Sequence, residues 1–187
     1  MNTTPSLSQS PSTATLPLVL AVLTLLFGQG MGILFGLNED VIKSRLSASA
    51  AEVRETVYKS DAAAIKAVLD KSWVYMQRAH LHAGGMGTTA VSLIVVLCLL
   101  GTSQRATTAI GVALGAGGFG YSVFWMWAGF RAPALGSTGV AKESLKWLAM
   151  PSSGAFVVET VAVLVLLIVT CVRRRRAASQ QMATANP

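Results

Sequence analysis

Both histidines of the chain lie in one short stretch, at positions 80 and 82. Two residues correspond to about 200° around a regular helix, so the pair cannot bind one metal ion from one helix face. Each imidazole needs other partners, and the nearest at helical spacing are Met76 for His80 and Met86 for His82. A single imidazole suits axial ligation of haem iron, and an imidazole with a thioether suits copper or a low-spin haem. The alternative is that both imidazoles lie at the level of the lipid headgroups and hydrogen-bond to water or to loop carbonyls.

One acidic residue, Glu159, lies inside an apolar run, where a carboxylate is costly and is usually turned toward the protein interior or a partner. It can pair with either histidine or with Arg131, and a carboxylate that accepts from an imidazole fixes the imidazole tautomer. The simpler alternative is that Glu159 reaches the membrane surface and that Arg131 anchors the chain there. The cofactors that such a set can support are haem b, a copper ion or a quinone-type molecule. The residues predicted to bind it are His80, His82, Met76, Met86, Glu159 and Arg131, with the two histidines as the candidate metal ligands.

The segment 78–87, Arg-Ala-His-Leu-His-Ala-Gly-Gly-Met-Gly, resembles the helix opening of small uncharacterised four-helix membrane proteins with a His-x-His followed by glycine. It is more distantly similar to the histidine-bearing helices of the catalytic subunits of haem-copper oxidases and nitric oxide reductases. In that superfamily such a histidine holds haem iron, so the resemblance implies at most one haem or one quinone-like ligand. The chain departs from the superfamily because it has only 2 histidines. A binuclear haem-copper centre, which needs several histidines on different helices, is therefore excluded.

The elements that must position these residues are membrane helices. Hydrophobic residues make up 52% of the 187 positions and charged residues only 12%, about half the usual share of a soluble domain. Each of four apolar runs is long enough to cross a hydrocarbon core of about 30 Å, or nearly so. The sequence therefore predicts an all-α, integral membrane four-helix bundle within residues 16–172, with spans at 16–37, 79–100, 109–127 and 155–172.

A charged segment, residues 38–78, separates the first two spans. Asn38 and Asp61 can each cap a helix, so we expect an extramembrane helical hairpin rather than a simple connector. The second arm carries an apolar stripe that ends at His80, which makes His80 the better candidate for an internal ligand. We further expect a loop at 101–108, a loop at 130–139 and a surface helix at 140–150 that Pro151 to Gly154 breaks. The tail at 1–15 and the segment 177–187 of the basic C-terminal tail, 173–187, are expected to be disordered.

The orientation follows from the basic block Arg173 to Arg176, which comes directly after the last apolar run. The positive-inside rule places such a block in the cytoplasm, and an even number of spans then places both termini there. We expect a multi-pass protein of a bacterial inner membrane, with the hairpin and the histidines at the outer face. Seven basic residues in the hairpin weigh against this orientation, although acidic residues nearly balance them. The first run, 16–37, is longer than a signal-peptide core and has no basic leader, which favours an uncleaved anchor.

The sequence contains none of the common enzyme motifs. No phosphate-binding loop, dinucleotide fingerprint, nucleophile elbow or metalloprotease motif is present, which argues against an enzyme. The net charge of +7 comes largely from the block that flanks the last span, so no nucleic-acid partner is expected. The leading hypothesis is an accessory or redox-associated protein with an outer-leaflet histidine site. One alternative is a structural or assembly partner that docks other membrane-protein subunits, or a second copy, through glycine faces such as Gly28, Gly32 and Gly36. Another alternative is an oligomeric small-solute transporter that depends on Glu159.

Overall fold

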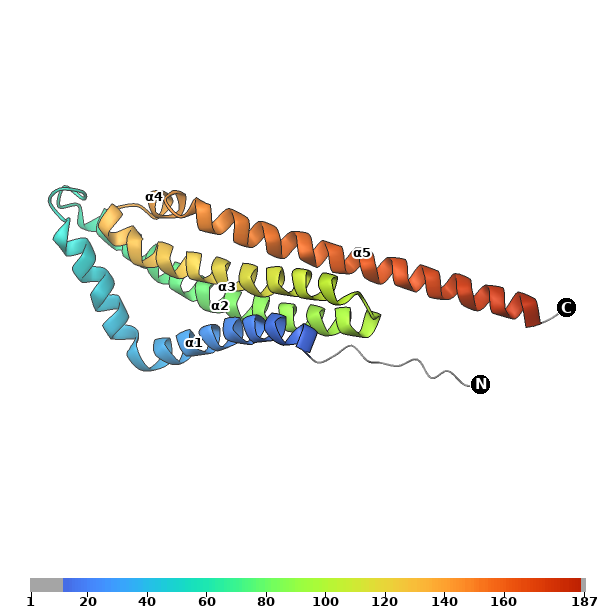
Figure 1. The fold of residues 1–187 in the computed structure, drawn as a ribbon. Helices are drawn as coiled ribbons and strands as arrows, with labels where there is room; N and C mark the ends of the chain where they lie inside the picture. The colour runs from blue at the N-terminus through green and yellow to red at the C-terminus, as the bar shows by residue number, and fades with distance from the viewer. Residues whose placement is uncertain (1–11, 186–187) are drawn as a thin grey trace.

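The computed structural model describes residues 12–185, and within that range every regular element is a helix. This confirms the all-α fold class. Four of the five helices are long and apolar enough to cross a membrane. They lie side by side as a bundle, and the short helix α4 sits at the hairpin end (Figure 1). The elements are α1 (Ser12–Glu52), α2 (Ala62–Leu100), α3 (Gln104–Leu135), α4 (Thr138–Glu143) and α5 (Lys146–Ala185).

Helix α1 is bent at Asn38, whose backbone angles of φ −135° and ψ 30° are not helical. The bend divides an apolar part before Asn38 from a charged arm after it, and the two parts point in different directions (Figure 1). Asn38 is also where the sequence predicts that a new helix begins. The bend therefore falls where the composition of the chain changes from apolar to charged.

Helix α2 runs without interruption from the second charged arm into the second apolar run. It begins where predicted, because the Asp61 carboxylate accepts hydrogen bonds from the backbone N–H groups of Ala63 and Ala64 at 2.8 and 3.0 Å. It ends at Gly101, whose φ of 69° is left-handed and therefore favours glycine. The histidines thus lie on a continuous helix near the level at which the charged arm ends.

The turn between the two arms packs against the end of α3. The Tyr58 hydroxyl donates a hydrogen bond to the carbonyl oxygen of Pro133 at 2.7 Å. The side chain of Val57 lies directly against Gly136, the left-handed residue that ends α3, so a side chain at position 136 would collide with it. The tip of the hairpin is therefore held by tertiary contacts.

Replacing Tyr58 with phenylalanine is expected to lower the free energy of unfolding by about 1 kcal/mol, because one buried hydrogen bond is lost. Burial raises the pKa of Tyr58 above its ordinary value of 10.0. The neutral hydroxyl therefore stabilises the fold fully below pH 10 and loses this effect as the pH rises through the raised pKa. Thermal unfolding between pH 7 and 11 checks this: the difference between wild type and Y58F should shrink at high pH. A difference that stays constant to pH 11 would contradict it.

Several predicted boundaries are wrong. The loop expected at 101–108 is only the turn from Gly101 to Ser103, and α3 continues to Leu135 through most of the loop expected at 130–139. The surface helix expected at 140–150 is divided, because α4 ends at Glu143 and α5 begins at Lys146. Helix α5 also passes through Pro151 and Gly154 without a break. Pro151 lies in the second turn of α5, where it has no backbone N–H to donate to the carbonyl oxygen of Trp147.

Both chain ends are also more helical than expected. Residues 12–15 belong to α1, and the rest of the predicted N-terminal tail lies outside the described residues. The C-terminal tail is helical as far as Ala185, so α5 projects beyond the other helices (Figure 1). The residues after Val172 include no glycine, and no proline before the last position, so nothing in this segment ends the helix.

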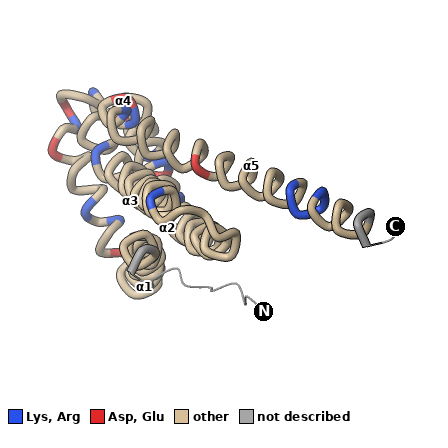
Figure 2. Tube along the Cα trace, turned by 45° about the vertical axis from the view of Figure 1, so that its right-hand side comes forward, with Lys and Arg blue, Asp and Glu red and all other residues tan. Residues whose placement is uncertain are grey.

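The first three helices pack against one another, whereas α5 packs mainly on α3 and has little contact with α2. Two glycines of α3 allow these close approaches. A Cβ atom built at Gly115 would lie 2.7 Å from the Leu20 Cβ of α1, and one built at Gly117 would lie 2.7 Å from the Ser152 carbonyl oxygen of α5. Charged residues gather at the hairpin end and near the end of α5, with few between them (Figure 2).

Candidate functional site

His80 lies between α2 and α1. Its Nδ1 is 2.7 Å from the carbonyl oxygen of Gly28, and because a carbonyl only accepts, Nδ1 carries the proton. The ring occupies the space above Gly32, where a built Cβ would lie 2.8 Å from the imidazole Cε1. The Phe35 ring is 6.1 Å away, centroid to centroid. His80 therefore points inward as predicted, but one nitrogen and one ring face are used to hold α1 against α2.

His82 points to the other side of α2, toward α3. Its ring is edge-on to Tyr121 at a centroid distance of 5.0 Å and nearly parallel to Trp125 at 6.0 Å, with 17° between the planes. The Arg78 guanidinium, one turn earlier on α2, lies 5.0 Å from the centre of the Trp125 ring. The two histidines thus belong to different interfaces, as the angle of about 200° between them requires.

The residues around His82 form a group that we call the aromatic cluster: Tyr75, Arg78 and His82 of α2 with Tyr121, Phe124 and Trp125 of α3. Trp125 is only 8% exposed. Its indole Nε1–H has no hydrogen-bond acceptor within residues 12–185. A buried donor without an acceptor is rare in folded proteins, and an acceptor from water or a ligand is the usual explanation.

The two candidate methionines both lie on the α3 side of α2. The sulfur of Met76 would be 3.0 Å from a Cβ built at Gly129, and the Met86 Cβ would be 3.3 Å from one built at Gly118. His82 and Met86 therefore share a side of the helix, whereas Met76 and His80 contact different neighbours. Met76 packs on α3 at Gly129, and His80 packs on α1 at Gly28.

Glu159 and Arg131 do not pair with either histidine within residues 12–185. Both side chains are half-buried, and neither has an ion pair or a side-chain hydrogen bond in the described part of the chain. Glu159 belongs to α5, which has little contact with α2, the helix that carries the histidines. Within the same range, no three His, Cys, Asp or Glu side chains form a group that could hold a metal ion.

Tyr121, Trp125 and Arg78 were not among the residues predicted to bind a ligand. In the sequence, the two aromatic residues have the appearance of an interfacial belt and Arg78 that of an end-of-arm charge. The available signal was their spacing, since Arg78 and His82, and Tyr121 and Trp125, are each four residues apart and so share a helix face. Only the packing of α2 on α3 shows that the two faces meet.

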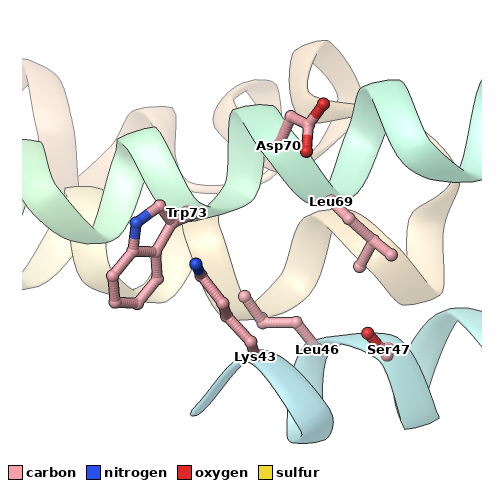
Figure 3. A pocket seen from close by; sticks show the side chains of 6 residues that line it. All are labelled: Lys43, Leu46, Ser47, Leu69, Asp70 and Trp73. Carbon is pink, nitrogen blue, oxygen red and sulfur yellow. The ribbon is translucent and has the colours of Figure 1, made fainter. Parts of the chain in front are cut away.

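A second candidate site is a pocket of about 370 Å³ between the arms of the hairpin. Figure 3 shows the side chains that line it, Lys43, Leu46 and Ser47 of α1 and Leu69, Asp70 and Trp73 of α2, with the Asp70 carboxylate turned away from α1. Its two charges are already paired along their own helices, Lys43 with Glu39 and Asp70 with Lys66. This pocket therefore offers less unused binding chemistry than the aromatic cluster.

Comparison with known proteins gives no match to a family model, to a curated protein or to a solved structure.

Proposed function

We propose that this chain is an accessory protein of a bacterial inner membrane that binds a quinone-type ligand at the aromatic cluster. The observation that carries the proposal is the buried Trp125 Nε1–H without an acceptor. A quinone has two carbonyl oxygens, which only accept hydrogen bonds, and a flat ring that stacks on aromatic side chains. A ligand oxygen placed at the indole would complete the hydrogen bonding of this donor.

The chemistry of the cluster favours such a ligand over a metal ion. An indole N–H and a guanidinium only donate hydrogen bonds, so neither can ligate a cation. The guanidinium is also positively charged and repels one. Trp125 and Arg78 can both donate to a carbonyl oxygen, and a neutral His82 has one ring N–H for the same purpose. The rings of Tyr121, Phe124 and Trp125 supply the apolar surface on which a quinone ring packs. Haem ligated by a single histidine remains the alternative, and it would require the free nitrogen of His82 to face the iron.

The proposed membrane placement is supported by the distribution of charge. Charged residues gather at the hairpin end and near the end of α5 and are sparse between them (Figure 2). The block Arg173 to Arg176 is at the end opposite the hairpin, so we place it and both termini in the cytoplasm. The aromatic cluster then lies in the outer half of the membrane, just below the hairpin.

Replacing Trp125 with phenylalanine is expected to weaken quinone binding about fivefold, which corresponds to about 1 kcal/mol for one hydrogen bond. The substitution keeps an aromatic ring and removes the donor. Trp127→Phe is the matched control, because Trp127 is 42% exposed and contacts Trp147 rather than the cluster. Titration of the detergent-purified protein with decylubiquinone, followed by isothermal calorimetry, measures both affinities.

Equal affinities of W125F, W127F and wild type for decylubiquinone would show that the Trp125 indole N–H does not contribute to binding. The absence of any decylubiquinone binding to wild type, or a Soret band in its absorption spectrum, would overturn the quinone proposal.

Co-purification of another membrane protein in place of a quinone would favour the assembly function. One observation favours that second function: only 11% of the most apolar window of α5 is buried, against 44% for α3, so α5 has the largest free surface for a partner. The glycines expected to dock a partner are less suitable, because Gly28 and Gly32 contact α2.

A further inference from the structure

The bend in α1 opens a groove between α1 and α3 that the proposed function does not use. The groove has a volume of about 490 Å³. Five of its lining residues lie on one stripe of α1, at positions 34, 38, 41, 42 and 45, and Phe130 of α3 faces them. The stripe crosses the bend at Asn38, so the groove extends from the apolar part of α1 onto its charged arm.

The wall of the groove is mostly apolar. Leu34, Val41, Ile42 and Phe130 supply its apolar side chains, and Asn38 and Arg45 are its polar and charged side chains. Arg45 is exposed and has no ion pair in the described residues, whereas its neighbour Lys43 is paired with Glu39. The Asn38 side chain likewise has no hydrogen-bond partner there. An unpaired cation and a free amide beside an apolar wall match a ligand with an anionic head and a hydrocarbon tail.

We infer that this groove binds one anionic phospholipid, with an acyl chain along the apolar wall and the phosphate at Arg45 and Asn38. Charge complementarity identifies the head, because a guanidinium forms charge-assisted hydrogen bonds with phosphate oxygens. The apolar wall indicates that the phosphate belongs to a lipid, because a free phosphate ion has no hydrocarbon chain to cover that wall. The position agrees with this, because Asn38 marks the boundary between the apolar run and the charged arm. The inference rests on the proposed membrane placement but not on the ligand of the aromatic cluster.

Native mass spectrometry of the full chain tests this inference, with palmitoyl-oleoyl phosphatidylglycerol and palmitoyl-oleoyl phosphatidylcholine as competing probes. We expect wild type to retain one phosphatidylglycerol in preference to phosphatidylcholine. Arg45→Gln should reduce that retention about fivefold. The matched control is Arg54→Gln, which removes the same charge from the turn between the arms, outside the groove. Circular dichroism of both variants verifies that each is folded.

Three outcomes would overturn the inference: no preference for the anionic lipid, equal loss in R45Q and R54Q, or displacement of the lipid by millimolar inorganic phosphate. If R45Q is not folded, Val41→Glu, which places a negative charge on the exposed side of the same wall, must abolish retention. The proposed quinone site is tested separately, because R45Q should leave decylubiquinone affinity unchanged and W125F should leave lipid retention unchanged. Failure of one proposal is therefore distinguishable from failure of the other.

Discussion

Replacing Gly117 with leucine is expected to lower the free energy of unfolding by about 3 kcal/mol and to separate α5 from α3. A Cβ atom at this position would lie 2.7 Å from the Ser152 carbonyl oxygen and 3.2 Å from the Phe156 backbone nitrogen. Both are backbone atoms, so no side-chain rotation can make room and the helices must move apart. Thermal unfolding in detergent, together with a spin-label distance between α3 and α5, measures the two effects.

The control for this change is Gly154→Leu. A Cβ atom at Gly154 would have no neighbour within 4 Å, so the same substitution meets open space. Because leucine favours a helix more than glycine does, we expect G154L to be as stable as wild type or more stable by up to about 1 kcal/mol. Equal destabilisation of the two variants would show that the close approach of α3 and α5 does not require a glycine at position 117.

His80→Ala is expected to lower the free energy of unfolding by about 2 to 4 kcal/mol while leaving decylubiquinone affinity nearly unchanged. The change removes the hydrogen bond from Nδ1 to the Gly28 carbonyl and the ring that fills the space above Gly32. His82→Ala should have the opposite profile, with weaker quinone binding and a smaller loss of stability. Chemical unfolding and the calorimetric titration, both applied to the two variants, provide the comparison.

The matched control on the same helix is Gln77→Ala, which removes an exposed side chain and should change stability by less than about 0.5 kcal/mol. If H80A abolished ligand binding in a protein as stable as wild type, His80 would be a ligand residue rather than a structural one. If H82A changed neither property, the aromatic cluster would not be the binding site.

The four long helices could be predicted from the sequence because each contains a long apolar run. Asp61 and Gly101 lie where the sequence places the ends of α2, and Asn38 lies where it places a change of element. The predicted helix boundaries are wrong where a proline that was expected to end a helix lies inside it. Pro133 lies near the C-terminal end of α3 and Pro151 near the N-terminal end of α5, and each helix continues through its proline.

The candidate site could be predicted only in part. Helical geometry assigns His80 and His82 to opposite sides of α2, and the structure agrees. Which helix contacts each side of α2 depends on how the helices pack, and a local sequence pattern does not encode that packing. Tyr121 and Trp125 are about 40 residues from His82 in the sequence, and only the contact of α2 with α3 brings them to it. Glu159 was expected near the histidines on the basis of depth alone, and its helix lies beside α3 instead.

The one-sided attachment of α5 also bears on how the chain is assembled during synthesis. Helices α1, α2 and α3 contact one another extensively, whereas α5 is made after them and rests chiefly on α3. Chains acquire contacts from the N-terminus onward as they are translated. The first three helices can therefore pack against one another before the ribosome has completed α5. Helix α5 then packs on the existing surface of α3, and the other helices need not rearrange. The four long helices would then assemble in the order in which they occur in the sequence.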